Sequence, residues 1–441
     1  MVHTFKIDEK YFLYDIESGS LHLCDKLSFF LVKNLNGEKI DLSDFDKTEI
    51  EECKAEIKKL ESEGLLFSKP ADYSNLEINS KAVKALCLNV SQNCNLECKY
   101  CFLSESGGLN GQNMTIKTAK AAIDFSIRKS DKKNLEVDFF GGEPLLNFNV
   151  VKDTVFYAIE QAKKFQKAFK FTLTTNGLIL NDEVIEFLNL YMDNVVISID
   201  GSREVHNNLR KTKNGSGSFD IVLKNALAFK KKRGDKNYYI RGTFTNLNLD
   251  FSKDILFLND CGFDQISIEP VVLRTDDTLA IRKKHLAKIK TEYQKFAKVY
   301  LELRKTDKWF NFFHFSIDLK NSPCIKKRIS ACGAGLSYLA VSANGDIYPC
   351  HQFVGKAKYI LGNVFNEGLN ENIRDKFCAN LLTKEKCRNC FAKYYCGGGC
   401  AYNCILTNSD INKPDEITCE IFKSRLECSL YVYAMENSRQ I

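Results

Sequence analysis

Hydrophobic and polar positions alternate through the middle of the chain in a way that predicts six β-strands. Between residues 84 and 275, short apolar runs of strand length are separated by longer stretches with helical periodicity, such as Thr115–Arg128 and Val150–Lys164. Strands that alternate with helices indicate a parallel α/β sheet. Six strands are about two fewer than a closed barrel of this kind contains, so we expect an open, partial (β/α)6 barrel. The expected strands are Leu86–Val90, Leu135–Phe140, Phe169–Leu173, Val195–Ile199, Tyr238–Phe244 and Gln265–Glu269.

The first 75 residues follow a different pattern. Residues 1–35 predict two short alternating strands joined at Ser18-Gly19 and then a helical stretch, and residues 47–63 predict a charged amphipathic helix that ends before Gly64. We expect a winged-helix-like domain over residues 1–75. Residues 1–80 carry 10 Lys+Arg against 17 Asp+Glu, which argues against DNA binding because duplex binding depends on phosphate neutralisation. A peptide-binding role through an exposed strand edge is expected, with a domain that serves only packing as the alternative.

Composition places the chain among cytoplasmic, metal-binding proteins. No apolar run is long enough for a membrane span, and no signal peptide is expected. Its 18 cysteines cluster at short spacings, which in a reducing compartment indicates metal binding and not a disulfide framework. The formal charge is +7, but basic residues do not gather with aromatic ones, so no nucleic-acid partner is expected. After a helical bridge over residues 276–319, the cysteine-dense residues 320–441 form the last expected domain.

Polar or glycine-rich turns follow four of the expected strands. A loop with Cys94, Cys98 and Cys101 follows the first, and Gly141-Gly142-Glu143-Pro144 follows the second. Asn176 lies in the turn after the third strand, and Ser198 lies in the fourth, just before Asp200-Gly201. Because the carboxyl ends of parallel strands meet on one rim, we expect these turns to form a single active site.

The loop after the first strand has the spacing CxxxCxxC. Four thiolates close a zinc or iron–sulfur site, whereas three leave one metal position open. The spacing and Phe102, the aromatic residue directly after Cys101, resemble the signature of the radical S-adenosylmethionine (SAM) enzymes. The resemblance covers about residues 85–270.

That resemblance implies a [4Fe–4S] cluster whose open iron binds SAM. An external one-electron reductant would then trigger cleavage to a 5′-deoxyadenosyl radical, chemistry that belongs to the cofactor. By the same resemblance, Gly141, Gly142 and Glu143 meet the methionine amino group of SAM, and Ser198 contacts the ribose. Arg210 suits the carboxylate because a guanidinium can bind it with two hydrogen bonds, and Asn176 and Phe102 line the site.

The second resemblance lies in the cysteine-dense region. Cys332, Gly345 and Cys350, followed by a CxxCx5CxxxC run and Cys419, resemble the seven-cysteine SPASM pattern over about residues 320–425. The resemblance implies two auxiliary [4Fe–4S] clusters, and so three clusters in all. Cys324 is expected as the fourth ligand of the first auxiliary cluster, with an open site for a substrate thiolate as the alternative; Cys404 exceeds the pattern. The implied ligands are Cys332, Cys350 and Cys400 for the first cluster and Cys387, Cys390, Cys396 and Cys419 for the second.

The order of the three regions resembles the maturases of ribosomally made peptides, in particular those of six-cysteine (SCIFF) peptides. The stretches that carry this resemblance include His3–Ser20, Leu135–Pro144, Ile240–Thr245 and Tyr348–Phe353. It implies that residues 1–75 bind the leader of a cysteine-rich precursor peptide and that the enzyme installs thioether cross-links. An anaerobic sulfatase-maturating enzyme, which makes formylglycine, is the second hypothesis, and a zinc- or DNA-binding regulator is the third. Nothing in the sequence identifies the carbon of the peptide that is attacked.

Overall fold

A ten-stranded, mostly parallel sheet organises the described part of the molecule. The computed structural model describes the chain except residues 71, 74–75, 77–79, 320–324 and 438–441. Within that part, the strands lie in the order β12-β11-β10-β8-β7-β6-β4-β13-β14-β15. The strands are β4 (Ala85–Ser91), β6 (Asn134–Gly141), β7 (Ala168–Thr175), β8 (Asn194–Ser198), β10 (Tyr238–Phe244), β11 (Gln265–Pro270), β12 (Asn311–Phe312), β13 (Tyr338–Val341), β14 (Asp346–Tyr348) and β15 (Gly362–Asn363).

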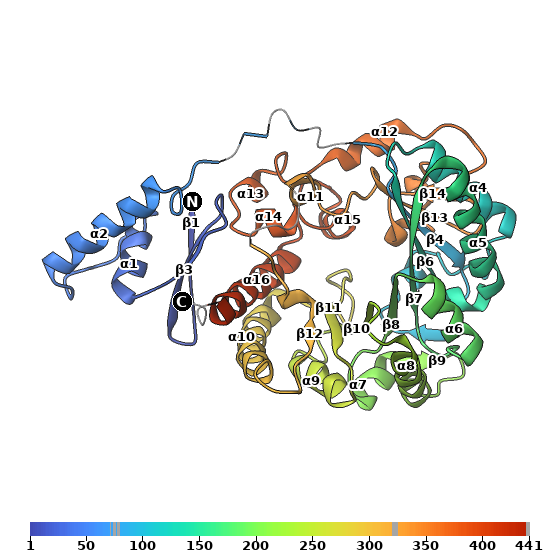
Figure 1. Ribbon diagram of the computed structural model, residues 1–441, viewed down its shortest axis with the longest axis horizontal. Helices are drawn as coiled ribbons and strands as arrows, with labels where there is room; N and C mark the ends of the chain where they lie inside the picture. The colour runs from blue at the N-terminus through green and yellow to red at the C-terminus, as the bar shows by residue number, and fades with distance from the viewer. Residues whose placement is uncertain (71, 74–75, 77–79, 320–324, 438–441) are drawn as a thin grey trace.

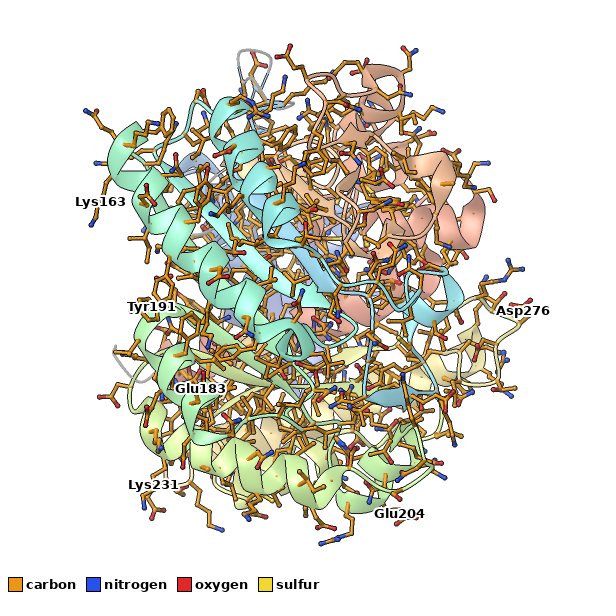
Figure 2. The ribbon with its side chains drawn as sticks, turned by 90° about the vertical axis from the view of Figure 1, so that its right-hand side faces the viewer. Lys163, Glu183, Tyr191, Glu204, Lys231 and Asp276 are labelled. Atoms are coloured by element: carbon orange, nitrogen blue, oxygen red, sulfur yellow. The ribbon has the colours of Figure 1, made fainter. Side chains whose placement is uncertain are left out.

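Helices cover the outer face of this sheet, as Figures 1 and 2 show. Alternate residues of β6, namely Leu135, Val137 and Phe139, are fully buried on that face, because strand side chains alternate between the two faces. The outward sides of the helices carry polar residues such as Lys163 and Lys231, labelled in Figure 2. The helices are α4 (Ile116–Arg128), α5 (Phe148–Phe165), α6 (Asp182–Tyr191), α8 (Phe219–Arg233) and α9 (Ser252–Asp260).

All six predicted strands are present and parallel, so the predicted α/β class is confirmed. The sheet is nevertheless wider than six strands. β12 joins β11 at one edge, and β13 pairs in parallel with β4 at the other, with Tyr338 opposite Ala85. β14 and β15 then continue antiparallel. The added strands are only two to four residues long, too short for a hydrophobic pattern to reveal.

Residues 1–62 form a separate antiparallel sheet with two helices. The expectation of two strands here was wrong, since the order is β1 (Val2–Ile7), β2 (Lys10–Asp15) and β3 (Leu21–Cys24). The missed turn, Asp8-Glu9, has φ of 54° and 57°, a conformation usually marked by glycine or asparagine. Because neither residue is present there, the turn could not be recognised from the sequence. The helices are α1 (Lys26–Leu35) and α2 (Lys47–Ser62). We call residues 1–70 the front unit; its winged-helix character stays a prediction.

The front unit is attached to the body beside the last helix, α16 (Glu416–Asn437) (Figure 1). The His3 ring stacks on Phe391 with centroids 3.5 Å apart, and Phe12 meets Tyr431 edge-on. Glu17, 5% exposed, pairs with Lys393 at 2.5 Å. Buried aromatic and ionic contacts of this kind hold the unit in one orientation.

Helix α10 (Leu286–Leu303) packs along α16. The remaining elements are short. None of the described helices is both long and apolar enough to cross a membrane. The short elements are β5 (Leu96–Cys98), β9 (Arg210–Thr212), α3 (Phe102–Glu105), α7 (Arg203–Leu209), α11 (Ile325–Ser330), α12 (Glu371–Arg374), α13 (Glu385–Arg388), α14 (Lys393–Cys396), α15 (Ala401–Asn408) and the 3-10 turns η1 (Pro144–Asn147), η2 (Lys283–His285), η3 (Phe313–Phe315), η4 (His351–Phe353), η5 (Ala357–Tyr359) and η6 (Asp375–Cys378).

Candidate active site

The three-cysteine loop is held by its own small ribbon. β5 pairs antiparallel with β9, which places Cys98 opposite Arg210. The Cys94 thiol accepts from the Leu96 amide at 3.4 Å and from Asn176 Nδ2 at 3.8 Å, and Cys101 stands at the start of α3. All three cysteines are half-buried. Burial raises the pKa of Cys98 to about 12, against the opposing effect of Arg210.

The predicted glycine turn lies directly against the segment that enters this loop. The Gly142 and Glu143 amides donate to the carbonyls of Ser91 and Asn93, each at 2.8 Å. A Cβ on Gly141 would stand 2.2 Å from the Ser91 oxygen, and one on Gly142 would stand 2.2 Å from the Asn93 oxygen. Any side chain here would push the two segments apart, so glycine is required for the turn to reach the cysteine loop.

Glu143 is fully buried and joins two of the predicted turns. One carboxylate oxygen accepts from the Leu145 amide at 3.0 Å and the Thr175 hydroxyl at 2.8 Å. The other accepts from the Asn176 amide at 2.7 Å. Burial raises the pKa of Glu143 to about 7. In this arrangement Glu143 fixes the turn after β6 to the turn after β7, beside the Cys94 loop.

Arg210 lies at the centre of a buried hydrogen-bonded chain. It donates to the Tyr100 hydroxyl at 2.8 Å, and Tyr100 donates to Asp200 at 2.6 Å. The other Asp200 oxygen accepts from the Thr243 amide at 3.1 Å. Arg210 is 8% exposed, yet its Nε has no hydrogen-bond partner in the described part of the chain. A buried, unpaired N–H is costly, and this one is suited to an anionic group such as the carboxylate of SAM.

The two remaining predicted residues lie at the end of β8 and directly after Cys101. Ser198 is half-buried at the end of β8. The Phe102 ring packs against Phe140, at 6.3 Å, and against His351, at 5.6 Å. Since His351 directly follows Cys350, this aromatic contact joins the cysteine loop to the cysteine-dense region.

The cysteines of that region come together in the two predicted groups. Besides burial, Cys400 and Cys332 raise the pKa of Cys350, which shows that these three lie close to one another. The second group, Cys387, Cys390, Cys396 and Cys419, lines a cavity of about 500 Å³. Buried Cys404 accepts from Lys384 Nζ at 3.7 Å, while Cys324 lies outside the described residues.

The donor sets suit clusters better than single ions. Among the residues described, no three His, Cys, Asp or Glu side chains converge closely enough to hold one metal ion. Thiolates of a [4Fe–4S] cluster bind different iron atoms and therefore stand farther apart than the ligands of one zinc. Four cysteine thiols around one cavity match the donor set of such a cluster.

Tyr100 and Asp200 belong to the site although the sequence pattern predicted a role for neither. Tyr100 occupies a variable position of CxxxCxxC, and its partners Asp200 and Arg210 lie 100 and 110 residues away in the chain. The turn Asp200-Gly201 at a strand end was the available signal. It marked the rim but did not reveal that Asp200 reaches back to the cysteine loop.

Comparison with known families agrees with this geometry. Residues 88–290 match the radical SAM superfamily, and residues 332–391 match the iron–sulfur cluster-binding SPASM domain. The chain carries a radical SAM domain and a SPASM domain. Both are domains that bind [4Fe–4S] clusters, and the radical SAM domain also binds SAM.

Several characterised proteins resemble most of this radical SAM–SPASM chain. A cysteine-type anaerobic sulfatase-maturating enzyme of Clostridium novyi is 26% identical over 79% of this chain and 95% of its own length. The subtilosin biosynthesis protein AlbA of Bacillus subtilis is 26% identical over 74% of this chain and 67% of its own. The structure of anSMEcpe with bound AdoMet and the Kp18Cys peptide covers 81% of this chain and 99% of that one, with TM-score 0.66 and 21% identity. The structural likeness establishes the fold.

Proposed function

We propose that this protein is a radical SAM maturase that installs thioether cross-links, from cysteine sulfur to carbon, in a ribosomally made cysteine-rich precursor peptide. The observation that carries the proposal is the front unit, fixed beside the SPASM domain by buried contacts such as Glu17 with Lys393. A maturase that acts on a precursor needs a module for the leader, whereas such a module has little purpose in sulfatase maturation.

The leader is proposed to bind along β3. Within the described residues, β3 pairs with β2 on one side and with no strand on the other. Leu23 on this strand is 48% exposed. An extended peptide can add to such an edge through main-chain hydrogen bonds, while side-chain contacts give selectivity. Docking there would deliver the core peptide to the radical SAM and SPASM domains.

The residues around the cluster and SAM are proposed to have the roles that the resemblance to radical SAM enzymes implies. Cys94, Cys98 and Cys101 hold the [4Fe–4S] cluster, and the unpaired Arg210 Nε supports its role toward the SAM carboxylate. The Gly141-Gly142 main chain, held against the cysteine loop, faces the amino group, and Ser198 contacts the ribose. Glu143, which joins the two turns, also meets this amino group, and Asn176 and Phe102 line the site. Once an external donor reduces the cluster held by these residues, bound SAM would supply a 5′-deoxyadenosyl radical able to remove a hydrogen atom from the peptide.

The SPASM cysteines are proposed to hold two auxiliary [4Fe–4S] clusters, the first with Cys324 as its fourth ligand. The cavity lined by the second group supports its assignment. Three clusters correspond to about twelve iron atoms per chain. Anaerobic iron and sulfide analysis tests this number, and zinc without sulfide would favour the regulator hypothesis instead. The proposed ligands are Cys332, Cys350 and Cys400 for the first cluster and Cys387, Cys390, Cys396 and Cys419 for the second.

Formylglycine formation is the second candidate. It is favoured by the likeness to the cysteine-type sulfatase-maturating enzyme over 79% of the chain and to the peptide-bound anSMEcpe structure. Both candidate reactions act on cysteine-containing peptides, so product analysis separates them.

The decisive experiment incubates the full chain anaerobically with SAM, a reductant and candidate cysteine-rich peptides. Thioether formation removes two hydrogen atoms per link and one alkylatable thiol, without loss of sulfur. Formylglycine formation removes the sulfur and yields a carbonyl that reacts with hydrazides. A peptide product of the second kind would contradict the thioether proposal.

A pair of variants tests leader docking. Leu23→Glu puts a charge on the exposed side of β3 and should weaken precursor binding about tenfold, since a charge in an apolar contact costs on the order of 1–2 kcal/mol. Leu190→Glu is the control, because Leu190 is 73% exposed on α6, away from the front unit. Equal affinity of both variants, measured by fluorescence anisotropy, would rule out β3 as the docking strand.

A further inference from the structure

One cation on the inner face of the radical SAM sheet has no place in the proposed function. On β10, Tyr238, Ile240 and Phe244 are buried toward the outer helices. Arg241 belongs to the opposite set of alternating side chains and is exposed. Because strand residues alternate between faces, its guanidinium lies on the inner wall of the partial barrel.

The strand register places Arg241 beside the expected cofactor. It stands opposite Ser198 on β8 and opposite Ser267 on β11, and neighbouring strands lie roughly 4.8 Å apart. Ser198 is the residue proposed to contact the ribose of SAM. Arg241 therefore lies one strand away from that contact, on the same face.

Both carboxylates near Arg241 are already engaged. Glu269 pairs with Arg425 of α16 at 3.1 Å. Asp200 accepts from Tyr100 and the Thr243 amide, with Arg210 at 4.0 Å. No described side chain is hydrogen-bonded to the Arg241 guanidinium.

The histidine near this wall, His314, does not add a second cation. His314, within 3.1 Å of Ser267, has its pKa lowered to about 3 by burial and then by Arg425. His314 is therefore neutral near pH 7. Arg241 acts through its charge to lower the pKa of Glu269 and, against the larger effect of burial, that of Asp200, but among the described residues it donates no hydrogen bond to either carboxylate.

We propose that Arg241 binds the thiolate of the substrate cysteine, at the inner wall beside the cofactor. The assignment of the cofactor side rests on the proposed function, but the thiolate is common to both candidate reactions on cysteine. A guanidinium favours the ionised form of a neighbouring acid, and the thiolate is the reactive form of cysteine. In this step the S–H bond breaks, the proton passes to solvent, and the sulfur keeps the electron pair.

Three variants test the role. Arg241→Gln removes the charge, Arg241→Lys keeps it, and Arg274→Gln is the control, since Arg274 lies on the loop that also carries Asp276 and projects from the body in Figure 2. Iron and sulfide content, measured first, shows whether each variant is assembled. Peptide modification is then measured from pH 6 to 9 with a peptide that wild type modifies.

The expected result is that the acidic limb of the pH–rate profile moves to higher pH in Arg241→Gln. Arg241→Gln should modify the peptide about tenfold more slowly at pH 7 and recover as the pH rises, because the thiol then ionises without help. Arg241→Lys should retain most of the rate, and Arg274→Gln should match wild type. A uniform loss at every pH, or a wild-type profile, would overturn the proposal.

A second measurement separates this proposal from the choice of reaction. Without reductant, a labelled synthetic peptide with one cysteine and its serine counterpart are compared for binding across the same pH range. Wild type should increasingly prefer the cysteine peptide as pH rises, and Arg241→Gln should lose that preference. Formylglycine in the product, with the preference intact, would refute thioether formation alone; a preference unchanged in Arg241→Gln would refute the role of Arg241 alone.

Discussion

The two cysteine-bearing regions are built on opposite principles. The loop at Cys94–Cys101 follows a buried parallel strand, pairs with β9 and contacts the turns after β6 and β7. The SPASM region from Cys387 to Cys400 consists of four-residue helices joined by turns around a cavity. The first is positioned by hydrogen bonds that exist without metal, whereas the second has little regular structure of its own.

The difference shows how metal and fold depend on each other in one chain. Where the sheet positions the thiols, removal of one ligand should eliminate chemistry and leave the structure intact. Where thiols surround a cavity, cluster binding contributes to folding itself.

Cys98→Ala should reduce the reductive cleavage of SAM to background, because it removes one of three ligands of the proposed open-iron cluster. The fold should persist, since β5 pairs with β9 through its main chain. Chromatography of the released 5′-deoxyadenosine measures SAM cleavage, and circular dichroism shows whether the fold persists. Cleavage at the wild-type rate would show that the site is assigned wrongly.

Cys419→Ala should release about four iron atoms per chain and expose residues 385–425 to proteolysis. Cys428→Ala, on the same helix, is the matched control, because Cys428 is 1% exposed and lies away from the cavity. That variant should keep its iron and lose about 1 kcal/mol of stability. Equal iron content in the two variants would contradict the assignment of Cys419.

Tyr100→Phe should weaken SAM binding about tenfold, because Arg210 and Asp200 both lose a buried hydrogen bond that positions the guanidinium. Tyr239→Phe is the control, since Tyr239 only accepts from Asn311 at 3.2 Å. Anaerobic calorimetry measures both affinities. If the two variants bind SAM alike, Tyr100 does not position Arg210.

Glu143→Gln should flatten the pH dependence of stability. Burial raises the pKa of Glu143 to about 7, so between about pH 4.5 and 7 the native state holds a proton that the unfolded chain has released. Wild-type stability should therefore fall, by up to about 3 kcal/mol, as pH rises through this window.

Thermal unfolding at pH 5 and pH 7.5 measures the effect, with Glu136→Gln as control on the same strand, since Glu136 is 43% exposed. A slope in Glu143→Gln equal to that of wild type would mean that another group carries the pH dependence.

The sequence predicted the strands and turns whose signals are local. The six parallel strands are buried and read as apolar runs, as with Leu86–Val90. The turn at Asp8-Glu9 lacks glycine, and β13 has only four residues, so neither produced a pattern. Spacing also located the cysteine loop and the turn at Gly141-Gly142.

The residues that escaped prediction depend on contacts between distant segments. Arg241 is an ordinary strand residue in sequence and gains its interest from its register with Ser198 and from Glu269 being paired elsewhere. The link from Tyr100 to Asp200 likewise exists only after folding. Spacing identifies groups that act through one short segment, and it does not identify groups assembled across the sheet.

The hydrogen-bonded junction between β13 and β4 has a consequence for electron flow. β4 leads into the cysteine loop, and β13 turns through β14 into Cys350, so two of the proposed clusters are attached to one continuous sheet. Their separation is then set by strand register and cannot vary as it would between domains on a linker. Because electron tunnelling falls steeply with distance, the junction would act, in the proposed function, as a rigid spacer that keeps the transfer rate between these two clusters constant while a peptide enters and leaves.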